Sequence, residues 1–379
     1  MEYKKVKLKE VCTVNQGLQI PISKRFKEKG PNRYFYITIQ FLKGNTDEYY
    51  IENPKKSVIC HKEDILVVRT GNTGMVLTGV EGCFHNNFFK VEPNEKIYSK
   101  YLYYTLNNKY MYKEMLNAAS GTTIPDLKHS AFYDLTIPLP TISEQHKIVN
   151  ILESIDKKIK LNNQINDNLL KFIKEFYKET FKYEQNKKKI KEVVEFSQGV
   201  QVPIENQSEK YENGFIRFIR IVDLTQGGKD NIRYIENKDR GIVDYDDVFM
   251  IRYGSPGILG WNYKGIIANN LFKINPKSDE TTKNYLYCYF NDDEIQNYIK
   301  QNATSSTMPA INFSLLYDRL IAIPNKEKLT EFDRIIENTR LKLLEIKKEN
   351  EKLEQLRDTL LPKLMNGEID LEKIYLEDM

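Results

Sequence analysis

An internal repeat constrains this chain of 379 residues more than any other feature of its sequence. Five blocks occur twice, in the same order, at an offset of about 182 to 184 residues. Solenoid and propeller repeats have periods of about 20 to 50 residues, so each copy is long enough to form a whole domain. We therefore predict a tandem duplication of a domain followed by a helix. The paired blocks are LKEVCTVNQGLQIPI (Leu8–Ile22) with IKEVVEFSQGVQVPI (Ile190–Ile204), DILVVRTGNTG (Asp64–Gly74) with DVFMIRYGSPG (Asp247–Gly257), NNFFKV (Asn86–Val91) with NNLFKI (Asn269–Ile274), GTTIPDL (Gly121–Leu127) with SSTMPAI (Ser305–Ile311), and YDLTIPLP (Tyr133–Pro140) with YDRLIAIP (Tyr317–Pro324).

Within each copy, the blocks before the last proline predict short strands. Some are apolar runs that end in glycine-containing turns, and others alternate polar with apolar or aromatic residues. Each copy is thus predicted to be a mixed, mainly β domain of about 140 residues. The predicted strands lie at residues 64–68 and 33–41 and at 247–251 and 214–222, and the predicted flanking helices at 101–112 and 285–298.

After Pro140 and again after Pro324, apolar residues recur every three or four positions, which predicts a long helix with one buried seam. The first helix is predicted to begin at Ser143 and to run for about 40 residues, with Asn162 and Asn166 as polar positions that set its register. Pro362 is predicted to stop or kink the second. The predicted seam residues are Ile148, Leu152, Ile155, Ile159, Ile165, Leu169, Phe172 and Phe176 in the first helix and Phe332, Ile336, Leu343, Ile346, Leu353, Leu356 and Leu360 in the second.

Neither helix can bury its seam alone, so we expect the two to pack on each other as an antiparallel coiled coil. The predicted fold class is α+β, with two similar mixed, mainly β domains separated by the two long helices and related by a pseudo-two-fold axis. The expected segments are 1–142, 143–183, 184–325 and 326–379. Such a chain suits duplex DNA read in two half-sites, while an intramolecular scaffold without a polymer target fits the repeat and the helices about equally well.

The composition is that of a globular protein that works in a reducing compartment. Hydrophobic residues make up 40% of the chain and charged residues 29%, and four scattered cysteines are too few for a disulfide framework. No apolar run is long enough to cross a membrane, and the start lacks the apolar core of a secretory signal. The net charge of +4 permits nucleic acid as a partner without demanding it.

The motifs of several enzyme classes are absent from the sequence. It has no Pro-Pro pair, which amino-methyltransferases use to hold their target base, and neither a phosphate-binding loop nor a dinucleotide fingerprint. Asp126 and Asp156 resemble an acidic pair of a nuclease only weakly, because the second copy has Ala310 and Arg340 at the matching places. The sequence therefore gives no support to a catalytic chain.

A zinc site is the other chemical alternative. Cys60, His61, Cys83 and His85 are residue types that bind zinc, but their spacing is not that of common zinc fingers. The second copy has no cysteine or histidine at these positions, so the shared fold does not need a metal. Buried or incidental side chains are the favoured interpretation, and no metal is predicted.

The remaining candidates are polar and basic residues at turns that occur in both copies. Arg69 and Arg252 each follow a strand and precede a glycine turn, where a guanidinium reaches phosphate or guanine; a structural ion pair with Asp64 or Asp247 is the equal alternative. A basic cluster around Lys24 occurs in the first copy only. The candidate DNA-binding residues are Gln16, Gln19, Lys24, Arg25, Arg33, Arg69, Thr70, Asn72, Thr122, Thr123, Gln198, Gln201, Arg217, Arg220, Arg252, Tyr253, Ser255, Ser306 and Thr307.

At these residues the chain resembles the specificity subunit of Type I restriction-modification systems. The resemblance is carried by IPLPTISEQHKIVNILESIDKKIKLNNQINDNL, by the Asp-Ile-Leu-x-x-Arg-x-Gly turn, by the Gly-Thr-Thr-x-Pro block and by LRDTLLPKLMNGEIDL near the end. It covers essentially the whole chain. The second copy departs from the pattern, since PNKEKLTE follows its last strand in place of the Glu-Gln form.

The resemblance implies a non-catalytic DNA-recognition subunit that lies in the cytoplasm of a bacterial or archaeal cell. It implies that each target-recognition domain reads one half of a bipartite, asymmetric site on double-stranded DNA. The helices would set the spacing and dock two methyltransferase subunits, which carry S-adenosylmethionine and methylate adenine N6, and restriction subunits that use ATP and Mg would join them. The chain itself would hold no cofactor. The alternative from another class is a coiled-coil adaptor between proteins.

Overall fold

The computed structural model describes residues 3–42, 48–121, 124–225, 231–303 and 309–371. The chain divides into two compact units, one formed by Met1–Ile159 with Glu351–Met379 and the other by Lys160–Asn350. Two long helices, α5 (Ile142–Phe181) and α11 (Lys326–Met365), each contribute residues to both units. Each unit thus contains one β-rich domain with the adjoining parts of both helices, and each is described by itself.

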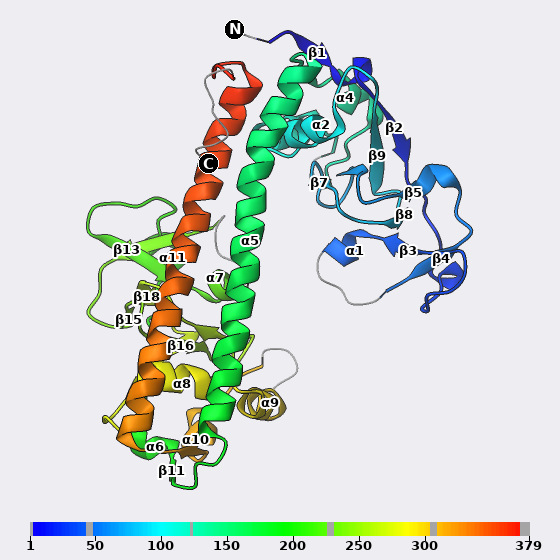
Figure 1. Cartoon of the computed structure of the whole chain (residues 1–379). Coiled ribbons are helices and arrows are strands. Elements are labelled where there is room, and N and C mark those ends of the chain that lie inside the picture. Colours follow the sequence, from blue (N-terminus) through cyan, green and yellow to red (C-terminus); the bar gives the residue numbers. More distant parts are fainter. Residues whose placement is uncertain (1–2, 43–47, 122–123, 226–230, 304–308, 372–379) are drawn as a thin grey trace. The chain divides into compact units, whose positions relative to one another are not determined.

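The domain of the first unit contains two four-stranded sheets and a two-stranded ribbon (Figure 1). The first sheet is antiparallel, whereas in the second β3 and β8 run parallel. The first sheet has the order β2 (Cys12–Gln16), β9 (Phe88–Pro93), β6 (Ile65–Val68) and β7 (Val76–Leu77), the second has the order β4 (Tyr50–Glu52), β3 (Arg33–Ile37), β8 (Gly82–Phe84) and β5 (Ile59–Cys60), and the ribbon pairs β1 (Lys5–Lys7) with β10 (Thr136–Pro138).

The domain of the second unit repeats this topology strand for strand. The equivalent strand pairs keep their direction, including a parallel pair between β13 and β18. The prediction of two similar mixed domains is therefore confirmed. The first sheet is β12 (Val194–Gln198), β19 (Leu271–Pro276), β16 (Val248–Ile251) and β17 (Leu259–Gly260), the second is β14 (Arg233–Glu236), β13 (Phe215–Ile219), β18 (Gly265–Ile267) and β15 (Ile242–Val243), and the ribbon is β11 (Lys187–Lys189) with β20 (Leu320–Ala322).

Short helices connect the strands of each domain. Four of the predicted segments are divided: the strands predicted at 33–41 and 214–222 end early and continue as short helices, and the helices predicted at 101–112 and 285–298 are each two helices. Asn108 and Asp292 cause the second break, because each side chain accepts a hydrogen bond from the first turn of a new helix. The helices are α1 (Ile39–Leu42), α2 (Ser99–Leu106), α3 (Lys109–Ala118) and α4 (His129–Asp134) in the first domain and α6 (Ile190–Val193), α7 (Ile221–Thr225), α8 (Lys283–Phe290), α9 (Asp293–Asn302) and α10 (Phe313–Tyr317) in the second.

Four single-turn 3-10 helices are also present in the part of the chain that the structure describes. The first domain contains η1 (Leu8–Glu10), η2 (Ile22–Lys24) and η3 (Lys56–Val58), and the second contains η4 (Ile204–Asn206). Since η2 and η4 fall at the same place in the two aligned blocks, the repeat extends to the loops after β2 and β12.

In the first unit, the start of α5 and the end of α11 share one hydrophobic core with the first domain. Leu152 of α5 and Leu364 of α11 are buried in it. Asp156 of α5 accepts hydrogen bonds from Tyr104 (2.6 Å) and Arg357 (2.8 Å), which ties α2 and α11 to the same carboxylate. The helices are thus packed on the domain as well as on each other.

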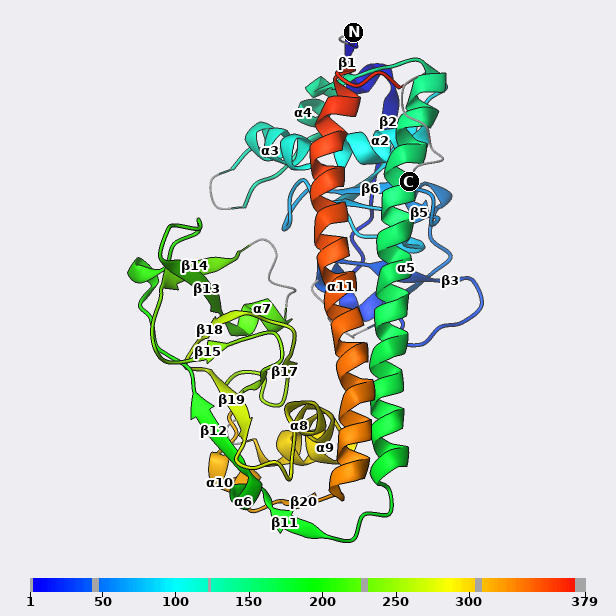
Figure 2. The ribbon, with the colours of Figure 1, turned by 60° about the vertical axis from the view of Figure 1, so that its left-hand side comes forward.

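In the second unit, the remaining parts of α5 and α11 lie side by side (Figure 2). They pack through aromatic rings and a polar layer. Phe176 stacks on Phe332 with ring centroids 5.5 Å apart. The buried side chain of Asn162 donates a hydrogen bond to Asn350 at 2.9 Å. From Asn162 to Phe176 the residue numbers rise along α5, while those of their partners on α11 fall from 350 to 332, so the two helices run antiparallel here. The antiparallel packing that the apolar pattern predicts is present in this unit.

Most predicted seam residues lie inward, but some details of the helices differ from the prediction. Helix α5 begins at Ile142 and is capped by Thr141 rather than by Ser143, because Thr141 and Glu144 form reciprocal hydrogen bonds across the first turn. Helix α11 continues past Pro362 to Met365. Among the predicted seam positions, Ile165, Phe172 and Leu356 are exposed, Ile159, Leu169, Phe176, Leu353 and Leu360 are half-buried, and Ile148, Leu152, Ile155, Phe332, Ile336, Leu343 and Ile346 are buried.

Candidate nucleic-acid interface

The repeated polar residues meet at one edge of the first sheet in each domain. Strands β2 and β6 both run antiparallel to β9 and lie on either side of it, so their carboxyl ends flank the start of β9. Gln16 is the last residue of β2 and Arg69 follows β6 directly. The same topology places Gln198 and Arg252 together in the second domain.

In the first domain, Gln16 and Arg69 are linked to each other and to the turn before β9. The Gln16 amide donates to the carbonyl of Asn86, and its oxygen accepts from Arg69 Nη1 at 3.5 Å. The backbone N–H of Arg69 donates to the carbonyl of Asn87 at 2.7 Å. This turn therefore supplies backbone acceptors that hold the side chain of Gln16 and the backbone of Arg69 in place.

The second domain repeats the same network. The Gln198 amide donates to the carbonyl of Asn269 at 2.8 Å, and its oxygen accepts from Arg252 Nη1 at 3.3 Å. The backbone N–H of Arg252 donates to the carbonyl of Asn270 at 2.8 Å. A Gln–Arg pair at the same sheet edge is thus part of the shared frame of both domains.

Glycine follows each glutamine because the backbone passes too close to the neighbouring turn for a side chain. A Cβ atom on Gly17 would lie 2.2 Å from the carbonyl oxygen of His85, and one on Gly199 would lie 2.3 Å from that of Ala268. Such contacts are far inside van der Waals distance. The two Gln-Gly blocks therefore fix the path of the loop that follows.

The first of the two arginines does not form the structural ion pair that the sequence analysis gave as its alternative role. Arg69 pairs with Asp126 rather than with Asp64, through Nε (2.6 Å) and Nη2 (2.9 Å). Asp64 instead accepts from the backbone N–H of His61. The Arg69 hydrogen bonds hold the pKa of the Asp126 carboxyl below its usual value. From the sequence alone, Asp126 was considered only as one member of an acidic pair in a nuclease. Its position in a block that occurs in both copies could have identified it as a residue of this site.

The loop after β2 carries the basic cluster of the first domain, and two of its arginines are committed to structural contacts. Arg25 donates twice to the carbonyl of Ile20 and lies over the Tyr36 ring. Arg33 pairs with Glu52 at 3.2 Å. By contrast, Lys24 is exposed, so its ammonium group is accessible to a ligand.

Two arginine candidates of the second domain are likewise held by one acid. Asp223 is 1% exposed, and its carboxylate lies 3.2 Å from Arg217 and 3.6 Å from Arg220. A buried carboxylate needs such partners, because an isolated buried charge is costly. Both arginines therefore have a structural role in the second domain.

The other candidates are distributed around this edge. Thr70 donates to Asp126 at 3.1 Å, and the ring of Tyr253 lies 4.9 Å from the Arg252 guanidinium. Among the remaining candidates, Gln19 and Gln201 are exposed, whereas Asn72 and Ser255 are half-buried. Thr122, Thr123, Ser306 and Thr307 lie outside the described residues.

The residues of the zinc and nuclease alternatives have other partners. Burial raises the pKa of the Cys60 thiol to about 11 and that of Cys83 to about 12, which disfavours the thiolate that binds zinc. Within the ranges given above, no group of three or more histidine, cysteine or acidic side chains is placed to hold a metal ion. Asp126 is hydrogen-bonded to Arg69 and Asp156 to Arg357, so each of these carboxylates has a basic partner of its own.

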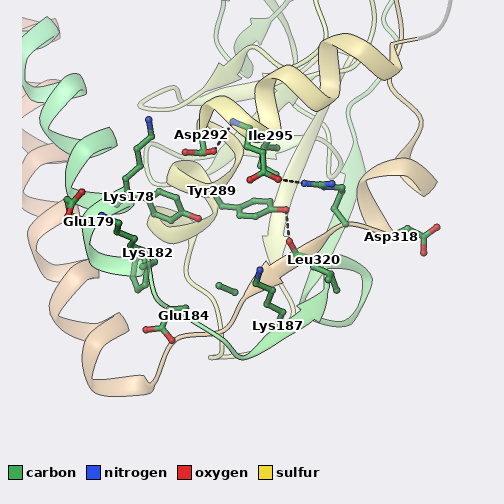
Figure 3. Close-up of a pocket in the computed structure, with 15 residues that line it drawn as sticks. Lys178, Glu179, Lys182, Glu184, Lys187, Tyr289, Asp292, Ile295, Asp318 and Leu320 are labelled. Atoms are coloured by element: carbon green, nitrogen blue, oxygen red, sulfur yellow. Dashed lines mark hydrogen bonds and ion pairs between the residues drawn. The ribbon is translucent and has the colours of Figure 1, made fainter.

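A groove in the second unit lies apart from the predicted residues (Figure 3). It has a volume of about 840 Å³ and is lined by residues at the end of α5, in β11, in α9 and in β20. Its charges include both signs, with Arg319 paired to Glu294 at 2.7 Å and Lys178 to Asp293 at 3.0 Å. This mixture does not form a basic surface, so we do not include the groove in the interface.

None of the helices in the described ranges combines the length and the apolar character needed to span a bilayer.

Comparison with known proteins assigns the chain to a family. A family model described as the Type I restriction modification DNA specificity domain matches twice, at residues 1–171 and 183–355, once for each copy of the repeat. Two similar curated proteins come from Methanocaldococcus jannaschii. The specificity subunit of the Type I restriction enzyme MjaIX is 25% identical over 374 residues, covering 90% of this chain and 85% of the relative, and that of MjaVIII is 24% identical over 384 residues, covering 90% and 87%.

The fold agrees with a solved structure. The crystal structure of the S subunit of a Type I restriction-modification system from M. genitalium matches 96% of each chain with a TM-score of 0.56 at 19% sequence identity. The expected family of non-catalytic DNA-recognition subunits, which carry no cofactor of their own, is therefore confirmed. This chain belongs to the Type I restriction modification DNA specificity family.

Proposed function

We propose that each of the two domains binds one half of a bipartite, asymmetric site on double-stranded DNA. The main support for this proposal is that the same Gln–Arg pair lies at the same sheet edge in both domains, while the residues around the pair differ. A shared frame gives both domains the same way of approaching a duplex, and different neighbours give them different base preferences. Gln16, Arg69, Gln198 and Arg252 are the centre of the proposed interface.

Exposed residues of the loops after β2 and β12 extend this interface. Gln19 and Lys24 are exposed in the first domain, and Gln201 is exposed in the second. Glutamine can contact adenine N6 and N7, whereas lysine neutralises phosphate. The first loop is rich in lysine and the second in glutamate, so we expect the first domain to make more phosphate contacts.

We further propose that the helical segments 143–183 and 326–379 set the spacing of the half-sites held by segments 1–142 and 184–325. They would also dock two methyltransferase subunits. Leu161, Ile165 and Phe172 support the docking role, because these exposed apolar side chains fall on one stripe of α5. The methyltransferase subunits would supply S-adenosylmethionine and the restriction subunits ATP and Mg. We propose that the assembly works in the cytoplasm, where it has access to chromosomal DNA.

The test is to co-express the full chain with the methyltransferase subunit of its system and to map N6-methyladenine in host DNA. The proposal expects a split motif with a fixed gap, in which only one half changes when residues 184–325 are exchanged for another domain. The matched control exchanges residues 1–142 and should change only the other half. A complex that forms and binds the methyl donor but produces no motif contradicts the proposal and favours the protein adaptor.

A further inference from the structure

The two equivalent arginines of the proposed interface occupy the same backbone position. The carbonyl of Arg69 accepts a hydrogen bond from the backbone N–H of Leu127 at 3.0 Å, and that of Arg252 accepts one from Ile311 at 3.1 Å. Together with their N–H contacts to the turn before β9 or β19, these bonds fix both residues at the same place in the fold. Any difference between them therefore arises from the side chains around the guanidinium.

Arg69 is neutralised within the first domain. Its Nε and Nη2 donate to the two carboxylate oxygens of Asp126, at 2.6 and 2.9 Å, in the bidentate arrangement that makes Arg–carboxylate pairs strong. Thr70 donates to the same carboxylate and holds it in place. The side chains of Arg69 and Asp126 are 32% and 28% exposed, so water competes with the pair only in part. A phosphate or guanine would have to displace a carboxylate to reach this guanidinium.

Arg252 has a different environment, because alanine occupies position 310 where the first domain has Asp126. Its Nε donates to the carbonyl of Ile311 at 3.3 Å, and its guanidinium lies 4.4 Å from the centre of the Phe313 ring. Throughout the described ranges, no carboxylate lies within 4.0 Å of Arg252. A guanidinium stacked on an aromatic ring keeps its charge and has N–H groups to donate to another acceptor.

We propose that positions 126 and 310 determine which arginine contacts DNA: Arg252 donates to an acceptor on the duplex, whereas Asp126 holds Arg69 as part of the frame. The acceptor is a phosphate oxygen or the O6/N7 edge of guanine, both of which suit a guanidinium. This inference rests on the proposed DNA-binding function and deepens it. It makes residue 310 a specificity-determining position that needs no contact with DNA of its own.

The test exchanges the two residues in the full chain bound to its methyltransferase subunit. Ala310→Asp gives Arg252 a carboxylate, and Asp126→Ala removes the one at Arg69. Ala310→Asn and Asp126→Asn are matched controls with similar size and no charge. The association constant between each complex and a random-sequence 40-base-pair duplex is measured from 50 to 200 mM salt. Thermal unfolding of each variant shows whether it folds.

If Arg252 contacts phosphate, Ala310→Asp reduces the magnitude of the salt slope by about 0.9, so the loss of affinity at 50 mM salt is roughly threefold larger than the loss at 200 mM. Arg252→Gln does the same, and adding Ala310→Asp to it has no further effect. Asp126→Ala increases the slope by a similar amount, since it frees Arg69. If Arg252 instead contacts guanine, Ala310→Asp leaves the slope unchanged but relaxes one position in one half of the methylated motif.

The proposal is overturned if folded Ala310→Asp and Arg252→Gln chains keep the wild-type slope and the wild-type motif. It is also overturned if Ala310→Asn weakens binding as much as Ala310→Asp, because size rather than charge would then be responsible. The failure of the DNA-binding function looks different: the wild-type complex itself would then show no salt-dependent binding to the duplex.

Discussion

Arg340 provides a sharp test of how the second domain is attached to α11. Its side chain is 5% exposed and pairs with Glu337 one turn earlier. Its Nη1 donates to Asn262 Oδ1 at 2.9 Å and to the carbonyl of Tyr245 at 3.1 Å, and Asn262 returns a hydrogen bond to the Arg340 carbonyl. One buried arginine therefore connects the helix to two loops of the domain.

Replacing Arg340 with alanine should destabilise the second unit by about 3 kcal/mol. The amide oxygen of Asn262 would lose its partner inside the protein, which costs about 1–3 kcal/mol for a buried acceptor. The Tyr245 carbonyl would lose one of two hydrogen bonds but keep the one from the Asn262 backbone, so it adds roughly 1 kcal/mol or less. For a unit of this size, the unfolding midpoint should fall by about 6–12 °C.

The assay is thermal unfolding of the full chain together with hydrogen exchange of residues 245–263. Arg334→Ala is the matched control, because Arg334 lies exposed on the same helix and its truncation should change the free energy of unfolding by about 0.5 kcal/mol or less. We expect the Arg340→Ala loops to exchange faster while the first domain is unchanged. A midpoint within about 2 °C of wild type, with unchanged exchange, would refute the reasoning.

Three further predictions concern stability. Replacing Asn162 alone with leucine should destabilise the chain by about 1–3 kcal/mol, because the buried Asn350 is left short of a partner. Replacing both Asn162 and Asn350 with leucine should recover most of that loss, and additive effects in a double-mutant cycle would argue against the pair. Gly17→Ala should lower the denaturation midpoint in urea, because its Cβ would clash with the His85 carbonyl, and an unchanged midpoint would contradict this. Burial lowers the pKa of His85 and His129 in the folded chain, so the unfolded chain binds more protons than the folded chain as pH falls below about 6.5. The free energy of unfolding should therefore decline at acidic pH, and a value that stays flat between pH 7 and 5 would contradict this prediction.

The repeat made much of the fold predictable, because any element read in one copy could be checked in the other. The strands at 64–68 and 247–251 follow from short apolar runs that end in glycine turns, and the helix after Pro140 follows from apolar periodicity; burial imposes both patterns directly. The ends of elements were less predictable. Thr141 caps the start of α5 through reciprocal hydrogen bonds with Glu144, and those contacts depend on backbone geometry that periodicity does not encode.

The candidate site was predictable in position but not in the state of each side chain. The sequence placed Arg69 and Arg252 at equivalent turns, and the structure places both at one edge of the sheet. Their partners come from segments more than 50 residues away, so the pairing of Arg69 with Asp126 depends on the tertiary fold. Arg217 and Arg220 are different, because their partner Asp223 lies only six and three residues further along the chain. The burial of Asp223, which commits both arginines to it, depends on the tertiary fold.

The two-stranded ribbons have a consequence for how such a chain can change over evolutionary time. In each domain the first strand pairs with the last, Lys5 opposite Pro138 and Lys187 opposite Ala322, so the chain enters and leaves the domain at neighbouring points. A foreign domain with the same ribbon could be spliced in by two recombination events without altering the path of α5 or α11. The ribbons thus allow a whole domain to be replaced between two neighbouring ends. Under the proposed function, such a replacement would change one half of the DNA site at once rather than by gradual substitution.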